Sequence, residues 1–219
     1  VLSRDHKSHK ILSINPGTGA SNLFFEETSP TWINIRSALK ALGAGGLLLS
    51  SEQNDLRQVF TVNAAGTLKS VTPATMRVNT INCIDERAGK VYVTGWQDSP
   101  LETHIFSVNM DGENLQKLSR GEGQHSARFA KNCSRYVGTF SGPDTPPQTR
   151  AYNHDGTPLA WLNENTLSAE HPYGPYMEAH AAPEFGQIPA PDGTLLDYKL
   201  YKPLDLKAGD KRPAITIVY

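Results

Sequence analysis

The stretch VYVTGWQDSPLETHIFSVNMDGENLQKL, residues 91–118, carries the pattern on which the fold of this chain depends. Apolar and polar residues alternate in Val91–Thr94 and again in Ile105–Asn109, which predicts two β-strands. Asp111-Gly112 then provides the chemistry of a tight turn, and Leu115–Leu118 returns as a short strand. The stretch therefore predicts an antiparallel meander of strands.

The same order of strand, strand, turn and strand recurs on both sides of this stretch. Residues 47–71 carry the turn at Ala65-Gly66, and residues 136–162 carry it at Asp155-Gly156. The three turn glycines are spaced 46 and 44 residues apart. A repeat of about 40–50 residues with four strands per unit is typical of β-propeller blades. A hairpin of Lys10–Ile14 and Asn22–Phe25 predicts the outer half of an earlier blade.

The repeat pattern ends near residue 165. Pro172 and Pro175 limit residues 166–183 to a connector that contains a short helix at most. Residues 184–189 and 195–201 then predict a new hairpin. The apolar run Pro213–Tyr219 predicts a buried strand, of the kind that normally has neighbours on both sides.

Composition excludes several classes of function. The 219 residues carry a net charge of −1 and contain no basic stripe, so we expect no binding to nucleic acid. The longest apolar run, Gly43–Leu49, is far shorter than the ~20 residues needed to span a bilayer, so we expect no membrane span. No motif indicates a metal ion or a cofactor. A disulfide between Cys83 and Cys133 is conceivable, but two separate buried thiols are the favoured prediction.

The chain resembles a known family of serine peptidases along nearly its whole length. Its C-terminal part resembles the opening of the α/β-hydrolase domain in the prolyl oligopeptidase family, through Glu184-Phe185-Gly186, Asp192-Gly193, Leu200–Pro203, Arg212-Pro213 and Val218-Tyr219. Its upstream part resembles the last propeller blades of the dipeptidyl peptidase IV branch, through Glu27–Asn34, Ser50–Glu52 with Arg57, and Gly123–Phe129.

The repeats and the resemblance together predict a fold class. We expect an all-β chain, with a partial β-propeller of about three to four four-stranded blades followed by the first strands of an α/β-hydrolase domain. The propeller part is expected to span residues 1–165, the connector 166–183, and the start of the peptidase domain 184–219.

The resemblance implies a serine exopeptidase that releases Xaa-Pro and Xaa-Ala dipeptides from the N-termini of peptide substrates. The family uses a Ser-His-Asp triad, with the serine in a G-x-S-x-G elbow. The 219 residues contain no such elbow, so we expect the triad to lie outside this chain and the chain alone to be inactive. The resemblance further implies a periplasmic or secreted protein and a homodimer of the intact enzyme.

Three residues are candidates for the site by this resemblance. Tyr219 matches the tyrosine whose hydroxyl stabilises the oxyanion, although in this chain it could be only a frayed terminal residue. Trp32 and Asn34 match a loop that approaches the substrate cavity and could line an outer subsite. The structural alternative for Trp32 is packing under the edge of a blade.

Two other features invite a catalytic interpretation. The family holds the substrate's amino group with two glutamates, but Glu26 and Glu27 precede a motif of a later blade, so we expect them to be turn residues. His125 is expected to be a structural histidine bonded to a neighbouring blade. The alternative for the whole chain is a non-enzymatic binding propeller, with residues 184–219 as an unrelated hairpin, because propellers host many functions.

Overall fold

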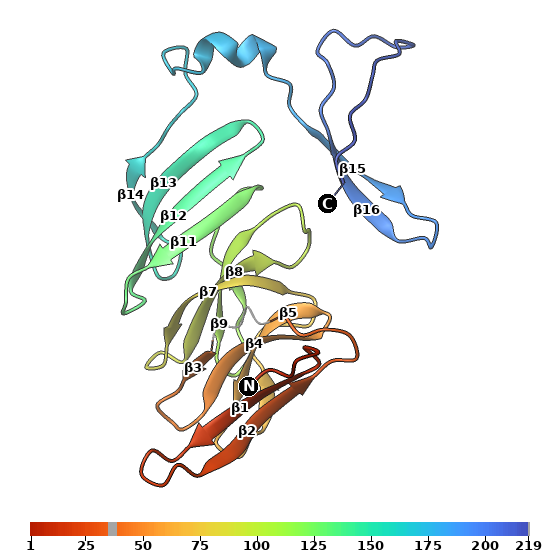
Figure 1. Ribbon diagram of the computed structural model, residues 1–219. Helices are drawn as coiled ribbons and strands as arrows, with labels where there is room; N and C mark the ends of the chain where they lie inside the picture. Colours follow the sequence, from red (N-terminus) through yellow and green to blue (C-terminus); the bar gives the residue numbers. More distant parts are fainter. Residues whose placement is uncertain (35–38, 219) are drawn as a thin grey trace. The chain divides into compact units, whose positions relative to one another are not determined.

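The computed structural model describes residues 1–34 and 39–218, which form β-strands and one short 3₁₀ helix (Figure 1). The chain divides into two compact units. The first comprises Val1–Gly142 with Pro147–Glu164, and the second comprises Pro143–Pro146 with Asn165–Tyr219. We describe each unit by itself.

The first unit contains three four-stranded antiparallel sheets, each with its strands in chain order. The first blade consists of β3 (Leu39–Ala41), β4 (Leu47–Asn54), β5 (Leu56–Val62) and β6 (Leu68–Ser70). The second consists of β7 (Arg77–Asp85), β8 (Lys90–Trp96), β9 (His104–Asn109) and β10 (Gln116–Lys117). The third consists of β11 (Gln124–Phe129), β12 (Arg135–Gly142), β13 (Thr145–Asn153) and β14 (Pro158–Asn163). These sheets confirm the four-strand repeat.

A two-stranded hairpin precedes the blades. It consists of β1 (Ser8–Ile14) and β2 (Ser21–Thr28), which pair antiparallel as the alternation of the sequence predicts.

The turn between the third and fourth strands has the same geometry in each blade. Gly66, Gly112 and Gly156 have φ values of 81°, 89° and 85°, a region that side chains disfavour. Each glycine N–H donates to the carbonyl oxygen three residues earlier, at Asn63, Asn109 and Asn153. A Cβ at Gly112 would lie 2.9 Å from the carbonyl oxygen of Ser70, near the end of the preceding blade. Glycine at this repeated position therefore serves both the turn and the close approach of two blades.

The core lies between the blades, because strand β8 is buried on both faces. Val91 and Val93 belong to a cluster that includes Leu48 and Val59 of the first blade. Tyr92, between them in the sequence, belongs to a second cluster with Leu118, Cys133 and Tyr136. Alternate residues of one strand thus face opposite neighbours, as the period of two along a strand requires.

Cys83 and Cys133 form a disulfide, so the prediction of two separate thiols was wrong. Cys83 lies on β7 of the second blade, and Cys133 lies in the turn that joins β11 to β12 of the third. Their Cα atoms are 5.9 Å apart, although 50 residues separate them along the chain. The spacing of two cysteines gives no information about such a contact, because the packing of adjacent blades creates it.

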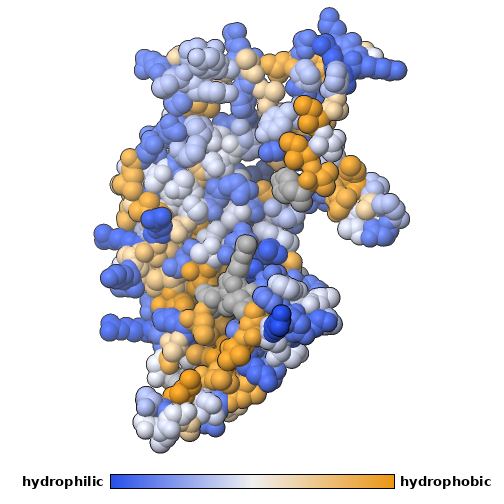
Figure 2. All heavy atoms as spheres, in the orientation of Figure 1, coloured by the Kyte–Doolittle hydropathy of each residue, from blue (hydrophilic) through white to orange (hydrophobic). Residues whose placement is uncertain are grey.

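The second unit contains a 3₁₀ helix and a hairpin. The helix spans Gly174–Ala179, and β15 (Glu184–Pro189) pairs antiparallel with β16 (Leu195–Leu200), which is the hairpin that the sequence predicts. Apolar side chains of this unit are exposed, and Figure 2 shows them gathered over the hairpin and the C-terminal segment.

The prediction of a buried strand at Pro213–Tyr219 was wrong for the residues that can be described. Residues 213–218 form no strand, and the exposed fractions of Ile215 and Val218 are 93% and 88%. A strand exists only where a neighbour receives its backbone hydrogen bonds, and no strand within residues 1–34 and 39–218 pairs with this segment. Across those same ranges, no helix has the length and apolar character needed to cross a membrane.

Candidate functional site

Asn34, Glu52 and Arg57 meet where β4 turns into β5, and we call these three residues the loop cluster. The Nδ2 of Asn34 donates to Oε2 of Glu52 at 2.7 Å. The guanidinium of Arg57 donates to Oε1 of the same carboxylate, also at 2.7 Å. Glu52 therefore holds both a neutral amide and a cation in place at the end of the first blade.

The loop cluster keeps Glu52 ionised. Burial opposes the charge of this carboxylate, but the hydrogen bonds from Asn34 and Arg57 outweigh burial and lower its pKa. The positive charges of Arg57 and Arg77 act in the same direction. A folded-state pKa below the unfolded one means that the cluster stabilises the fold above about pH 4.5, and that this contribution is lost as the pH falls through the folded-state pKa.

Glu52→Gln tests this coupling through the pH dependence of stability. We expect the wild type to lose more stability than the variant between pH 6 and pH 3, because only the wild type must protonate a hydrogen-bonded carboxylate. Urea unfolding at a series of pH values measures the difference. Glu122→Gln, at an exposed position, is the matched control and should follow the wild type. Equal pH profiles for wild type and Glu52→Gln would contradict the role of the cluster.

Trp32 does not pack under a blade edge, so that structural alternative was wrong. Its exposed fraction is 56%, and its indole stacks on the imidazole of His6 with ring centroids 3.9 Å apart. The Oγ of Ser29 accepts the backbone N–H of Trp32 and so shapes the turn that presents the ring. Trp32 and Asn34 therefore have different partners, and their role as a substrate subsite stays a prediction.

Glu26 and Glu27 lie on strand β2, so their prediction as turn residues was wrong. Register explains the difference, because β1 pairs with β2 through both of these positions. Glu26 accepts a hydrogen bond from Ser8 Oγ at 2.7 Å, and Glu27 accepts one from Ser51 Oγ at 2.6 Å. Both carboxylates thus have partners within the fold. Tyr219, the oxyanion candidate, lies outside the described residues.

His125 lies between two blades, as predicted for a structural histidine. Its Nε2 contacts the carbonyl oxygen of Gly121 at 3.0 Å, and its backbone N–H donates to the carbonyl oxygen of Thr103 on the second blade. Its ring stacks between His104 and Phe140, with centroids 5.2 Å and 4.6 Å away. Burial lowers the pKa of His125, which favours the neutral imidazole at pH 7.

The structure also assembles an acid–histidine–serine arrangement that sequence reasoning missed. Glu102 contacts His104 Nε2 at 2.6 Å, and Ser119 Oγ lies 2.9 Å from His104 Nδ1. These residues are close in sequence, but only the pairing of β9 with the segment after β10 brings them into contact.

This arrangement resembles a catalytic triad, yet the repeat assigns it a structural role. Ser119 Oγ already accepts the N–H of Ile105 at 3.1 Å, and Ser119 is buried. Thr72, at the equivalent place in the first blade, accepts the N–H of Val59 at 2.9 Å in the same way. A hydroxyl with the same bond in two blades secures the end of each sheet rather than acting as a nucleophile.

The three meander sheets and the packing between them define this chain as part of a β-propeller protein. A family model described as "Dipeptidyl peptidase IV (DPP IV) N-terminal region" matches residues 1–147, which is more than half of the chain. The chain therefore belongs to the dipeptidyl peptidase IV family, through that N-terminal region.

Individual relatives agree with this assignment. Dipeptidyl peptidase 8 of Mus musculus is 28% identical over 141 residues, which cover 62% of this chain and 16% of the relative. A probable dipeptidyl-aminopeptidase B of Aspergillus oryzae is 26% identical over 141 residues, which cover 63% of this chain and 15% of that protein. The match therefore spans about a sixth of the length of each relative.

Solved structures share the fold. The dipeptidyl peptidase 4 of Porphyromonas gingivalis superposes with a TM-score of 0.81 at 21% identity, covering 94% of this chain and 29% of that one. A putative dipeptidyl aminopeptidase IV of Bacteroides ovatus superposes with a TM-score of 0.79 at 20% identity, covering 97% of this chain and 33% of the other.

Proposed function

We propose that this chain provides propeller blades to a serine exopeptidase that releases Xaa-Pro and Xaa-Ala dipeptides from peptide N-termini. The observation that carries the proposal is the family match over residues 1–147, which covers the hairpin, the first two blades and the first half of the third blade. The names of the relatives as dipeptidyl peptidases support this activity over a non-enzymatic binding module.

The proposal divides the chain into propeller (1–165), connector (166–183) and the start of a hydrolase domain (184–219). The exposed apolar side chains of the β15–β16 hairpin support the last assignment, because such surfaces are commonly covered by a further part of a protein. Within the intact enzyme, Tyr219 would donate a hydrogen bond to the oxyanion, and Trp32 with Asn34 would line an outer peptide subsite.

The decisive experiment compares two polypeptides that contain these residues. The complete gene product is expected to hydrolyse Gly-Pro-p-nitroanilide and to react with a fluorophosphonate at one serine, whereas residues 1–219 alone are expected to do neither. Failure of the complete gene product in both assays would overturn the proposal. Turnover by residues 1–219 alone would show that the triad was wrongly placed outside them.

Two variants of the complete enzyme test the site residues. Tyr219→Phe should lower kcat at nearly unchanged KM, because the phenol acts only on charge formed in the transition state.

Trp32→Ala should raise KM for longer peptides while leaving the short anilide unaffected, because the ring would contact only the far end of the substrate. Unchanged kinetics in either variant would remove that residue from the site.

The disulfide supports a periplasmic or secreted location, because disulfides persist in oxidising compartments and are rare in the cytosol. Thiol alkylation in intact cells should leave Cys83 and Cys133 unmodified until a reductant is added.

The intact enzyme is further proposed to be a homodimer. Light scattering tests this, and a monomeric mass would contradict it.

A further inference from the structure

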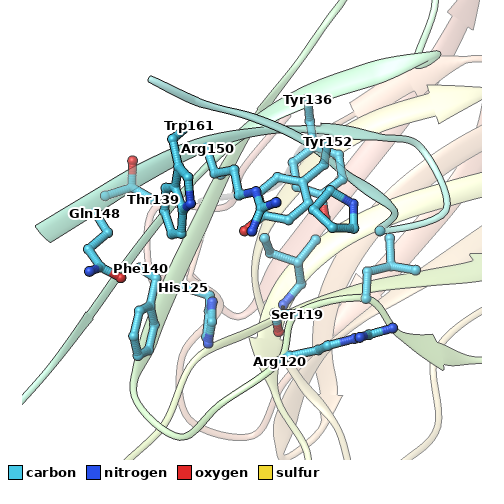
Figure 3. Close-up of a pocket in the computed structure, with 15 residues that line it drawn as sticks. Ser119, Arg120, His125, Tyr136, Thr139, Phe140, Gln148, Arg150, Tyr152 and Trp161 are labelled. Carbon is cyan, nitrogen blue, oxygen red and sulfur yellow. Dashed lines mark hydrogen bonds between the residues drawn. The ribbon is translucent and has the colours of Figure 1, made fainter. Parts of the chain in front are cut away.

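A cavity of about 320 Å³ lies in the first unit, between the second and third blades. Its wall comes mainly from β12, β13 and β14, with the segment after β10 on the opposite side (Figure 3). Cavities of this size are within the range that holds small organic ligands. Ser119 of the acid–histidine–serine arrangement lies in its wall, whereas none of the three residues of the loop cluster does.

Arg150 is one of two arginines in the wall of this cavity. Its guanidinium carbon lies 4.7 Å from the centroid of the Trp161 ring on the neighbouring strand. Its Nε is buried and has no hydrogen-bond acceptor. In the part of the chain that can be described, no ion pair involves Arg150. A buried donor without an acceptor is costly, so an anion that enters the cavity would gain from this group.

The rest of the wall favours an anion with an apolar body. Tyr136 and Tyr152 stack with ring centroids 5.0 Å apart, and Figure 3 places Arg150 between these rings and Trp161. Arg120 adds a second cation at the wall, and none of the residues described as lining the cavity is an aspartate or a glutamate. Aromatic faces with one oriented guanidinium are suited to a carboxylate, because Arg binds carboxylates through parallel hydrogen bonds.

We propose that this cavity binds a small organic carboxylate, with its carboxylate on Arg150 and its apolar body against Trp161, Tyr136 and Tyr152. The carboxylate could belong to a free organic acid or to the C-terminus of a short peptide, since both present the same chemistry. The proposal rests on the first unit alone and does not depend on peptidase activity.

Calorimetric titration of the full chain tests the proposal with three probes. 3-Phenylpropionate represents a free acid, the dipeptide Gly-Phe represents a peptide terminus, and 3-phenylpropionamide is the neutral analogue. At least one of the two carboxylates is expected to bind with a Kd of about 1 mM or lower, and the amide at least tenfold more weakly. The carboxylate that binds better identifies the source.

Variants assign the binding to the cavity. Arg150→Met should weaken the carboxylate about tenfold or more, whereas Arg128→Met, at an exposed arginine of β11 outside the cavity, should leave it unchanged. Arg150→Lys keeps the positive charge but loses the planar pair of donors that binds a carboxylate through two hydrogen bonds, so it should give an intermediate Kd. Thermal melting shows whether each variant is folded.

Three results would overturn the proposal. These are no saturable binding of either carboxylate at 10 mM, equal binding of the carboxylate and the amide, or equal binding by wild type and a folded Arg150→Met. Because peptidase activity is not the readout, failure here would leave the proposed function standing, and failure of the peptidase assays would leave this site standing.

Discussion

Replacing Cys83 and Cys133 together by alanine is expected to lower the free energy of unfolding of the propeller unit by about 4 kcal/mol. The bond closes a loop of 50 residues, and a loop of that length restricts the unfolded chain strongly. The native structure also loses contacts, because Cys133 belongs to the buried cluster between the second and third blades. The two effects act in the same direction.

Urea unfolding followed by tryptophan fluorescence measures this loss. Reduced wild type should unfold at a lower urea concentration than the oxidised protein, and the double variant at a slightly lower one still, because it also lacks the packing of the Cys133 sulfur. The double variant should not respond to reductant. The slope of the transition should rise in both, since an unfolded chain without the cross-link exposes more surface. If the reduced and oxidised wild type unfolded at one urea concentration, the disulfide would contribute nothing to holding the blades together.

Tyr92→Ala is expected to cost about 3–5 kcal/mol, the range for a large aromatic side chain removed from a core. Tyr92 is 2% exposed, and its ring lies 4.6 Å from that of Phe129 on the next blade. It also packs against Leu118 and Tyr136, so its removal opens a cavity between two blades. The neighbouring backbone cannot close this cavity easily, because each blade is held by its own ladder of hydrogen bonds.

Two further variants separate packing from the hydroxyl group. Tyr92→Phe should cost about 1 kcal/mol or less, because the hydroxyl has one long contact, 3.4 Å from His154 Nδ1. Tyr176→Ala, at a tyrosine that is 62% exposed, should change stability by less than about 0.5 kcal/mol. Thermal and urea unfolding measure all three. A loss below 1 kcal/mol in Tyr92→Ala would mean that the blades do not depend on this contact.

The repeat could be predicted from sequence because its signals are local. Alternation within Val91–Thr94 predicts a strand without reference to distant contacts. The turn at Gly112 needs a positive φ, so the glycine itself marks the turn in the sequence. These features recur at fixed spacing, so the number and order of strands in each blade follow from them. The candidate loop residue Asn34 was likewise found by its place in a motif, whereas its bond to Glu52 was not.

Contacts between residues that are far apart in the sequence could be learned only from the tertiary structure. The same apolar character that predicted a strand at residues 213–218 produced none, since no partner strand receives its hydrogen bonds among the described residues. Ser119 and His104 come together in a triad-like geometry. The hydroxyl of Thr72 accepts a backbone N–H in the first blade just as that of Ser119 does in the second, which indicates a structural role.

The sequence by itself thus determined the blades, their turns and the family, because each depends on residues within a few positions of one another. Only the tertiary structure decided that Cys83 meets Cys133, that Tyr92 faces the third blade, and that the Nε of Arg150 is buried without an acceptor. These outcomes depend on how neighbouring sheets pack face to face. Residues 50 positions apart come into contact there, and no local pattern records which of them do.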